Sequence, residues 1–162
     1  MNTQKTENVS FEELLDKNGY LVYTNVGVSM MPLLRQRKDI MEIRKKGSER
    51  CRKYDAVLFK RPDTEGRGKY VLHRILKVFP DGTYWIVGDN CVEGEIVREE
   101  NVLGILTSVN RNGRKISVTD PGYKAYVYLW CAPYHLRFFV LKSRRRLRSA
   151  AGKLLRSLGL RK

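Results

Sequence analysis

The chain has 162 residues, the length of a single domain, and its 42% hydrophobic and 10% aromatic residues exclude a disordered protein. The formal net charge is +15, but it is uneven: residues 142–162 hold nine Lys and Arg and no acidic residue, which leaves +6 for residues 1–141. A modestly basic domain therefore carries a strongly basic tail. Such a tail suits nucleic acid, acidic partners or an anionic membrane surface.

The sequence also argues against a metal site. Its three cysteines, Cys51, Cys91 and Cys131, stand far apart, and only two histidines accompany them. This spacing matches no zinc motif, so we expect isolated thiols and no bound metal.

No membrane span is expected either. The polar, acidic start does not resemble a secretory signal, and no segment supplies the roughly 18 clean apolar residues of a span. The nearest, residues 125–141, is interrupted by Pro133, His135 and Arg137. We interpret it as a segment that lies on or packs against a surface, in a protein that is membrane-associated without a transmembrane helix, or cytoplasmic.

The first predicted element is a short helix over residues 10–17. Ser10 followed by Glu13 forms a capping box, and Asn18-Gly19 ends the helix. From residue 20 the pattern changes to short runs rich in Val, Ile, Tyr and Leu between turn residues. These runs predict strands at residues 20–26, 40–44, 56–61, 70–79, 84–87, 102–110 and 115–118.

Two turns support this interpretation. Pro80-Asp81-Gly82 and Asn112-Gly113 both contain residues that tight hairpin turns require. Seven short strands with little helix between them predict a mainly β fold, a coiled antiparallel β-domain, rather than βαβ units.

The tail after residue 120 is predicted to be helical. One face holds a leucine-rich stripe, with basic residues beside it. The helix either packs this stripe on the domain or lies on an anionic lipid surface. We therefore divide the chain into a helical lead-in (1–19), a β-domain (20–120) that should survive without the tail, and the tail (121–162). The stripe consists of Leu147, Ala151, Leu154, Leu155 and Leu158.

Two residues could form a catalytic pair. Ser29 follows the first predicted strand, where Gly27 permits a close turn and Pro32 stiffens the exit. His73 lies inside an apolar strand, and a buried imidazole near neutral pKa can serve as the general base that a serine nucleophile needs. Arg74 should point to the opposite face of that strand.

The sequence leaves the role of a third candidate residue, Asp89, open. Asp89 ends the following strand in a turn, and it either orients His73 or simply forms the turn.

These segments, in this order, resemble the sequence boxes of type I signal peptidases over about residues 20–110. The base position carries His in the branch that includes the endoplasmic-reticulum and archaeal enzymes and Lys in the bacterial leader peptidases, so the resemblance is to the Ser-His branch and to small clostridial members of the superfamily. The matching segments are Ser29-Met30-Met31-Pro32, Lys53–Phe59 with Tyr54 in place of the usual Gly, His73-Arg74-Ile75, Gly88-Asp89-Asn90 and Val102-Leu103-Gly104-Ile105.

The resemblance implies a signal-peptidase or LexA-like β-fold and an endopeptidase that cleaves signal or leader peptides, with no cofactor or metal. Ser29 would be the nucleophile and His73 the base, with the extended substrate bound as an added strand. Gly27 occupies the position where many relatives carry a hydroxyl residue, so the oxyanion site would rely on backbone N–H groups around Gly27, Val28 and Met30, chiefly that of Ser29. The orienting carboxylate would be Asp89, Glu93 or Glu95.

Two alternatives remain. One is a dedicated peptidase for a single precursor peptide. The other is a non-catalytic basic module on the same fold, bound to membranes or nucleic acid. No helix-turn-helix precedes the peptidase-like region, so nucleic acid is not the expected partner. We expect an anionic membrane surface to be contacted by residues 126–162, and the oligomeric state is not predicted.

Overall fold

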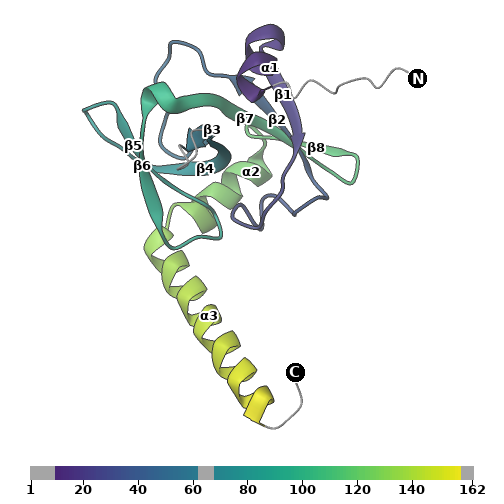
Figure 1. The fold of residues 1–162 in the computed structure, drawn as a ribbon, viewed down its shortest axis with the longest axis vertical. Coiled ribbons are helices and arrows are strands. Elements are labelled where there is room, and N and C mark those ends of the chain that lie inside the picture. Colours follow the sequence, from purple (N-terminus) through teal and green to yellow (C-terminus); the bar gives the residue numbers. More distant parts are fainter. Residues whose placement is uncertain (1–9, 62–67, 158–162) are drawn as a thin grey trace.

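The computed structural model describes residues 10–61 and 68–157, and within them the chain is mainly β (Figure 1). An eight-stranded antiparallel sheet runs in the order β1-β2-β7-β3-β4-β5-β6, with β8 paired to β7. The strands are β1 (Tyr20–Thr24), β2 (Ile40–Lys45), β3 (Ala56–Arg61), β4 (Lys69–Val78), β5 (Thr83–Val87), β6 (Gly94–Arg98), β7 (Val102–Arg111) and β8 (Arg114–Ser117).

The predicted mainly β, antiparallel class is confirmed, and seven of the strands lie where the pattern placed them, within one or two residues at most ends. The eighth, β6, was missed. Its sequence, Gly-Glu-Ile-Val-Arg, has only one buried side chain, Val97, and only two residues that favour strands, Ile96 and Val97. Pairing with β5, where Ile96 lies opposite Trp85, stabilises it as an edge strand.

The helix α1 (Phe11–Asn18) begins at the predicted capping box. The Glu13 N–H donates to Ser10 Oγ and the Ser10 N–H donates to the Glu13 carboxylate, each over 3.1 Å. Leu15 is the buried residue of α1, and it packs into the larger of two hydrophobic cores. Asn112 and Gly113 both have positive φ, as the predicted tight turn between β7 and β8 requires.

The sheet curls so that β3 is covered on both sides, and in Figure 1 the other strands wrap around β3 and β4. Ala56 and Leu58 belong to one core, whereas Val57 and Phe59 belong to the other. Successive side chains point to opposite faces of a strand, so a run of four apolar residues is what a strand between two cores needs. The first core also contains Met30, Leu33 and Leu34, which anchor the loop after β1.

The chain after β8 is helical. Helix α2 (Pro121–Tyr126) continues through a π-helical turn (Val127–Cys131) towards α3 (Tyr134–Ser157). The predicted boundary at residue 120 coincides with the start of α2, and beyond it the side chains of Tyr123 and Cys131 are buried. A chain ending at Asp120 would lose these buried contacts, and whether it keeps an intact domain stays a prediction.

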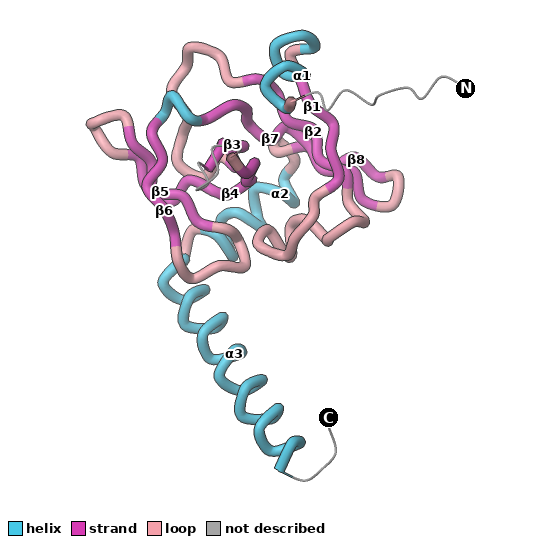
Figure 2. Tube along the Cα trace, viewed as in Figure 1, coloured by secondary structure: helices cyan, strands magenta, loops and turns pink. Residues whose placement is uncertain are grey.

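Helix α3 has two different halves. Arg137 and Leu141 are buried against the domain, whereas Arg144–Ala151 are exposed on every side as the helix leaves the sheet (Figure 2). The alternative in which the tail packs its stripe on the domain therefore fails at Leu147, which is 70% exposed. The structure does not describe the side chains of Leu154, Leu155 and Leu158. Within the described ranges, none of the helices has the length and apolarity of a membrane span.

Candidate active site

Ser29 lies on a turn that follows β1. Gly27 has a φ of 144°, a conformation that side-chain-bearing residues rarely adopt, and the Asn25 amide donates to the Gly27 carbonyl over 2.8 Å. Next to the serine, the Met30 side chain is completely buried, and the Met31 N–H bonds back to the Val28 carbonyl. Met30 thus holds the turn in the core while Ser29 stays half-exposed at the surface.

A second turn, Gly88-Asp89-Asn90, clamps the Ser29 turn. The Asn90 backbone N–H donates to the Ser29 carbonyl over 2.7 Å, and its side-chain amide donates to the Val28 carbonyl over 3.1 Å. A Cβ atom placed on Gly88 would lie 2.7 Å from the Ser29 carbonyl oxygen and 3.0 Å from His73 Nε2. Gly88 therefore marks the place where the Ser29 turn and the imidazole converge, and only glycine leaves them room.

His73 occupies the middle of β4, opposite Val57 of β3, and is 8% exposed. Its Nε2 faces Gly88 and the Ser29 turn, and its Nδ1 lies 3.6 Å from Glu95 Oε1. Within the described residues, Nδ1 has no hydrogen-bond partner, and no hydrogen bond joins the imidazole to the Ser29 hydroxyl. The imidazole thus lies between the Ser29 turn and the Glu95 carboxylate and forms no hydrogen bond with the Ser29 hydroxyl or with Glu95.

The electrostatics of His73 are dominated by its burial, which lowers the pKa of the imidazole below its ordinary value of about 6.5. The Glu95 carboxylate acts in the opposite direction, and the Arg61 guanidinium acts with burial. These two side chains are themselves joined, with Arg61 Nε donating to Glu95 Oε2 over 2.8 Å. A lowered pKa favours the neutral imidazole at pH 7, and this is the form that a general base requires.

Among the three carboxylates predicted as orienting groups, Glu95 is the one that the structure brings to His73. Glu93 is exposed at the edge of the same cleft. Asp89 is completely buried, and its two oxygens accept from Arg74 Nε and a terminal nitrogen of Arg74 over 2.8 and 2.7 Å. Asp89 thus serves as the counter-ion of Arg74, which lies next to His73 in the chain but bonds elsewhere.

Asp89 also joins the tail helices to the clamp turn. The Tyr126 hydroxyl donates to its carboxylate over 2.8 Å, and a buried terminal nitrogen of Arg137 lies 3.6 Å away. Burial alone would raise the pKa of Asp89, but Arg74, Tyr126 and Arg137 together hold it below its usual range. The clamp turn is therefore fixed on one side to Ser29 and on the other to α2 and α3.

Ser29 and His73 line one cleft of about 720 Å³, together with Glu93, Glu95 and the stretch from Asn25 to Val28. Within the described chain, the Ser29 backbone N–H donates no hydrogen bond, so it is free to bind an oxyanion. Of the other predicted oxyanion residues, Gly27 and Val28 border the cleft, whereas the Met30 side chain points into the core and has only its backbone N–H to offer.

Cys91 also lines the cleft, and its thiol is a possible rival nucleophile. Its Sγ would lie 2.9 Å from a Cβ on Gly88, close to the imidazole. However, burial raises the pKa of this thiol, so it is protonated at neutral pH, and the thiol form is a poor nucleophile. No group of His, Cys, Asp and Glu side chains among the described residues is arranged to hold a metal ion.

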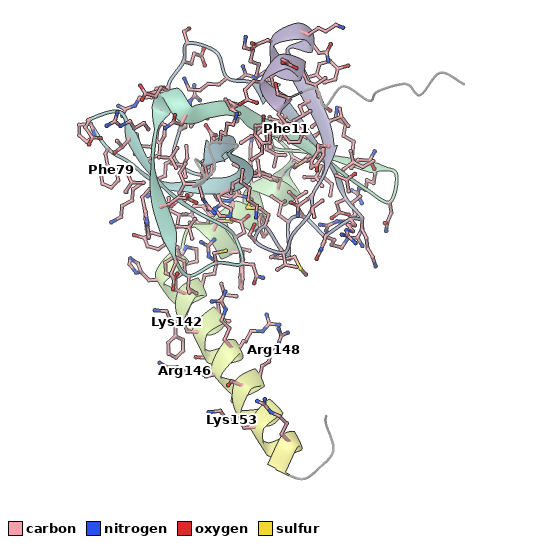
Figure 3. All side chains as sticks on the ribbon, in the orientation of Figure 1. Phe11, Phe79, Lys142, Arg146, Arg148 and Lys153 are labelled. Carbon is pink, nitrogen blue, oxygen red and sulfur yellow. The ribbon has the colours of Figure 1, made fainter. Side chains whose placement is uncertain are left out.

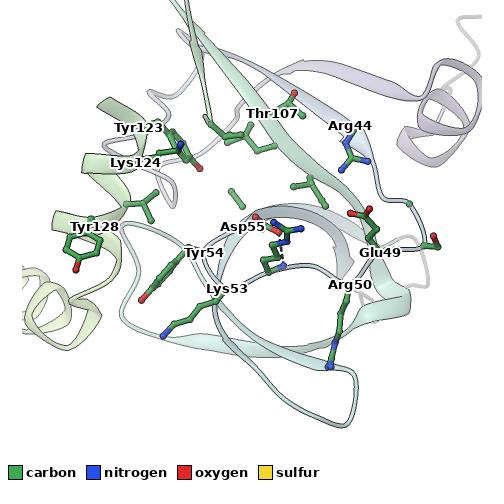
Figure 4. Close-up of a pocket in the computed structure, with 18 residues that line it drawn as sticks. Arg44, Glu49, Arg50, Lys53, Tyr54, Asp55, Thr107, Tyr123, Lys124 and Tyr128 are labelled. Carbon is green, nitrogen blue, oxygen red and sulfur yellow. Dashed lines mark hydrogen bonds between the residues drawn. The ribbon is translucent and has the colours of Figure 1, made fainter. Parts of the chain in front are cut away.

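A larger cavity of about 980 Å³ lies elsewhere, between residues 47–55 and α2 (Figure 4). Its rim carries Arg44, Arg50, Lys53 and Lys124, with Tyr54 and Tyr128 towards the tail. Its lining contains Ser48 and the ionisable side chains of Glu49, Lys53 and Asp55, but no histidine. Size alone would favour this cavity, but the chemistry favours the cleft at Ser29.

Sequence reasoning missed three contributors to the site. Arg61 binds Glu95, Tyr126 binds Asp89, and Arg145 of α3 lines the cleft with a terminal nitrogen 3.4 Å from the Asn90 carbonyl. One signal was present for the tail: Arg137 interrupts an apolar run, and a buried guanidinium needs a buried carboxylate. Nothing local in the sequence identifies Arg61 or Arg145.

Comparisons with family models, with curated proteins and with solved structures find no match to this chain.

Proposed function

We propose that this protein is a serine endopeptidase of the signal-peptidase superfamily, in its Ser-His branch, and that it cleaves signal or leader peptides. The carrying observation is that the Ser29 turn, Nε2 of His73 and the Gly88–Asn90 clamp converge beside one cleft, with Glu95 on the far side of the imidazole. Three boxes that are separate in the sequence thereby form one site. A module that only binds membranes gives no reason for this convergence.

In the proposed reaction, Ser29 Oγ attacks the scissile carbonyl carbon while His73 Nε2 accepts the hydroxyl proton. The Ser29 N–H stabilises the oxyanion, and His73 returns the proton to the leaving amine. An acyl-enzyme remains, and a water molecule activated by the same imidazole hydrolyses it. Glu95 is placed to hold the imidazolium that forms in both steps, through its position beside Nδ1.

The substrate would bind in an extended conformation. Residues 25–28, before the nucleophile, and residues 69–72, before the base, both line the cleft, so two stretches of backbone border the path of a bound peptide. Backbone groups at strand ends can pair with an extended chain while side-chain pockets select its residues.

A library of extended synthetic peptides tests the proposal, with cleavage products identified by mass spectrometry. We expect internal cuts at a consistent set of flanking residues, and no release of single terminal residues, because the cleft is open along the peptide path. A wild-type protein that cuts no peptide of the library, nor any leader peptide made by the same organism, contradicts the proposal.

The pH dependence of cleavage tests the roles of Glu95 and Arg61. In the wild type, kcat/KM should rise with pH through the pKa of His73, with a midpoint below about 6.5, because only the neutral imidazole accepts a proton. Glu95→Gln removes a charge that favours the imidazolium, so the midpoint should move to lower pH and kcat should fall. Arg61→Gln removes a charge that opposes it, so the midpoint should move to higher pH.

The matched control is the exposed pair Arg98 and Glu100, whose glutamine variants should leave the pH profile unchanged. If the Glu95 and Arg61 variants shift the midpoint in the same direction, or not at all, Glu95 is not the orienting group.

A further inference from the structure

Among its described residues, the outer half of α3 makes one hydrogen bond to the β-domain, from Arg145 to the Asn90 carbonyl, and is otherwise mostly exposed. Over residues 142–156 it carries seven Lys and Arg and no acidic residue, and Figure 3 shows Lys142, Arg146, Arg148 and Lys153 along its length. Such a run of basic residues does not stabilise a helix in water, because like charges at neighbouring turns repel one another. A polyanionic partner would remove that repulsion.

The same helix exposes large apolar side chains. Leu136, Phe139 and Leu147 are 62%, 69% and 70% exposed. Leu136 and Leu147 are eleven residues apart, about three full turns, so they lie on one face, with Phe139 beside them. The domain-facing positions are different ones, since Arg137 and Leu141 are the buried residues among the side chains of this helix that the structure describes. The apolar face therefore points away from the sheet.

The direction of α3 relative to the domain is set by buried contacts near its start. Arg137 pairs with Asp89, and the rings of Tyr134 and Phe138 pack against Trp85 of β5 with centroid distances of 5.5 and 6.3 Å. A helix held in this way presents its apolar face in a constant orientation, with cations on both sides of it.

From these observations we infer that α3 lies on an anionic membrane surface. Its apolar face is buried among the acyl chains, and the basic side chains on both sides of that face contact the phosphate headgroups. A bilayer with anionic lipid can bury the apolar face and neutralise the basic side chains at the same time. Nucleic acid would neutralise the cations but leave the leucines in water. A second copy of this helix would bring seven cations against seven more.

The position of the cleft follows from this arrangement. Arg145, at the start of the exposed half, lines the Ser29 cleft, so a membrane-bound α3 keeps the cleft beside the headgroups. The binding itself does not rest on the proposed peptidase activity, because it is measured without a substrate.

Co-sedimentation of the full chain with vesicles tests the inference. We expect binding to vesicles that mix phosphatidylglycerol with phosphatidylcholine, little binding to pure phosphatidylcholine, and release as NaCl rises from about 0.1 to about 1 M. The triple variant Arg144→Gln, Arg146→Gln, Arg148→Gln should bind on the order of ten-fold more weakly or worse. The double variant Leu136→Ser, Leu147→Ser should lose a similar factor, since it removes apolar burial without changing the charge.

A charge-matched control separates this site from net charge. Lys38→Gln, Arg98→Gln, Arg114→Gln removes three exposed cations from the β-domain and should bind almost as well as the wild type. All exchanged side chains are exposed, and circular dichroism checks that each variant is folded. Equal losses in the two triple variants overturn the inference, as does a wild type that ignores anionic vesicles. Unchanged vesicle binding by the leucine variant, with tighter binding to duplex DNA, would assign the helix to nucleic acid instead.

Discussion

Replacing Ser29 by alanine is expected to abolish peptide cleavage and to leave the domain folded. The Ser29 side chain is half-exposed, and its neighbours Met30 and Asn90 hold the turn through groups that the substitution does not touch. The free energy of unfolding should therefore change by less than about 0.5 kcal/mol. Loss of a nucleophile in a serine peptidase lowers kcat by a factor of roughly 10⁴ or more.

His73→Ala should cause a loss of similar size, because the hydroxyl of Ser29 is a weak nucleophile without a base. The double variant should be no worse than either single variant, since the two residues act as one unit. His73→Lys should also be nearly inactive, because the site would have to lower the pKa of a lysine by several units to make it a base.

The chain offers a matched control for each substitution. Ser48 and His135 are both exposed and lie outside the cleft, and His135 is the second of the two histidines. Ser48→Ala and His135→Ala should keep full activity. Turnover by Ser29→Ala at the wild-type rate, on a peptide that the wild type cuts, would show that the cleavage belongs to other residues.

Asp89→Asn should have the largest effect on stability of any single carboxylate exchange in this domain. Asp89 is completely buried between Arg74, which binds both of its oxygens, and Arg137, whose guanidinium nitrogens have no hydrogen-bond partner among the described residues. Removing the negative charge leaves two buried cations uncompensated. Breaking a buried ion pair from one side costs about 3–5 kcal/mol, so the urea midpoint should fall steeply.

This prediction separates a structural Asp89 from a catalytic one. If Asp89 only holds the clamp turn, the folded fraction of Asp89→Asn should keep the acid-side midpoint of kcat/KM, apart from a small downward shift because the Asp89 charge raises the pKa of His73. Asp16→Asn, at an exposed pair with Lys45, is the control and should cost less than about 1 kcal/mol. An Asp89→Asn variant with wild-type stability and no activity would place Asp89 in the catalytic group and displace Glu95.

Local sequence signals determined most of the secondary structure. The Ser10 capping box, the Asn112-Gly113 turn and the apolar run of β3 each act over a few residues, so their physical basis is visible in the sequence. The same is true of Ser29 and His73, whose neighbours in the chain define a close turn and a buried strand.

The partners of these residues were decided only by the tertiary structure. Glu95 stands beside His73 because β6 pairs with β5 and the sheet curls, and β6 has too weak a pattern to be predicted. Asp89 joins Arg74 of β4 to Tyr126 and Arg137 of the tail, three segments far apart in the chain. A buried charge takes whichever opposite charge the packed chain brings within reach, and the sequence pattern contains the charges but not the distances between them.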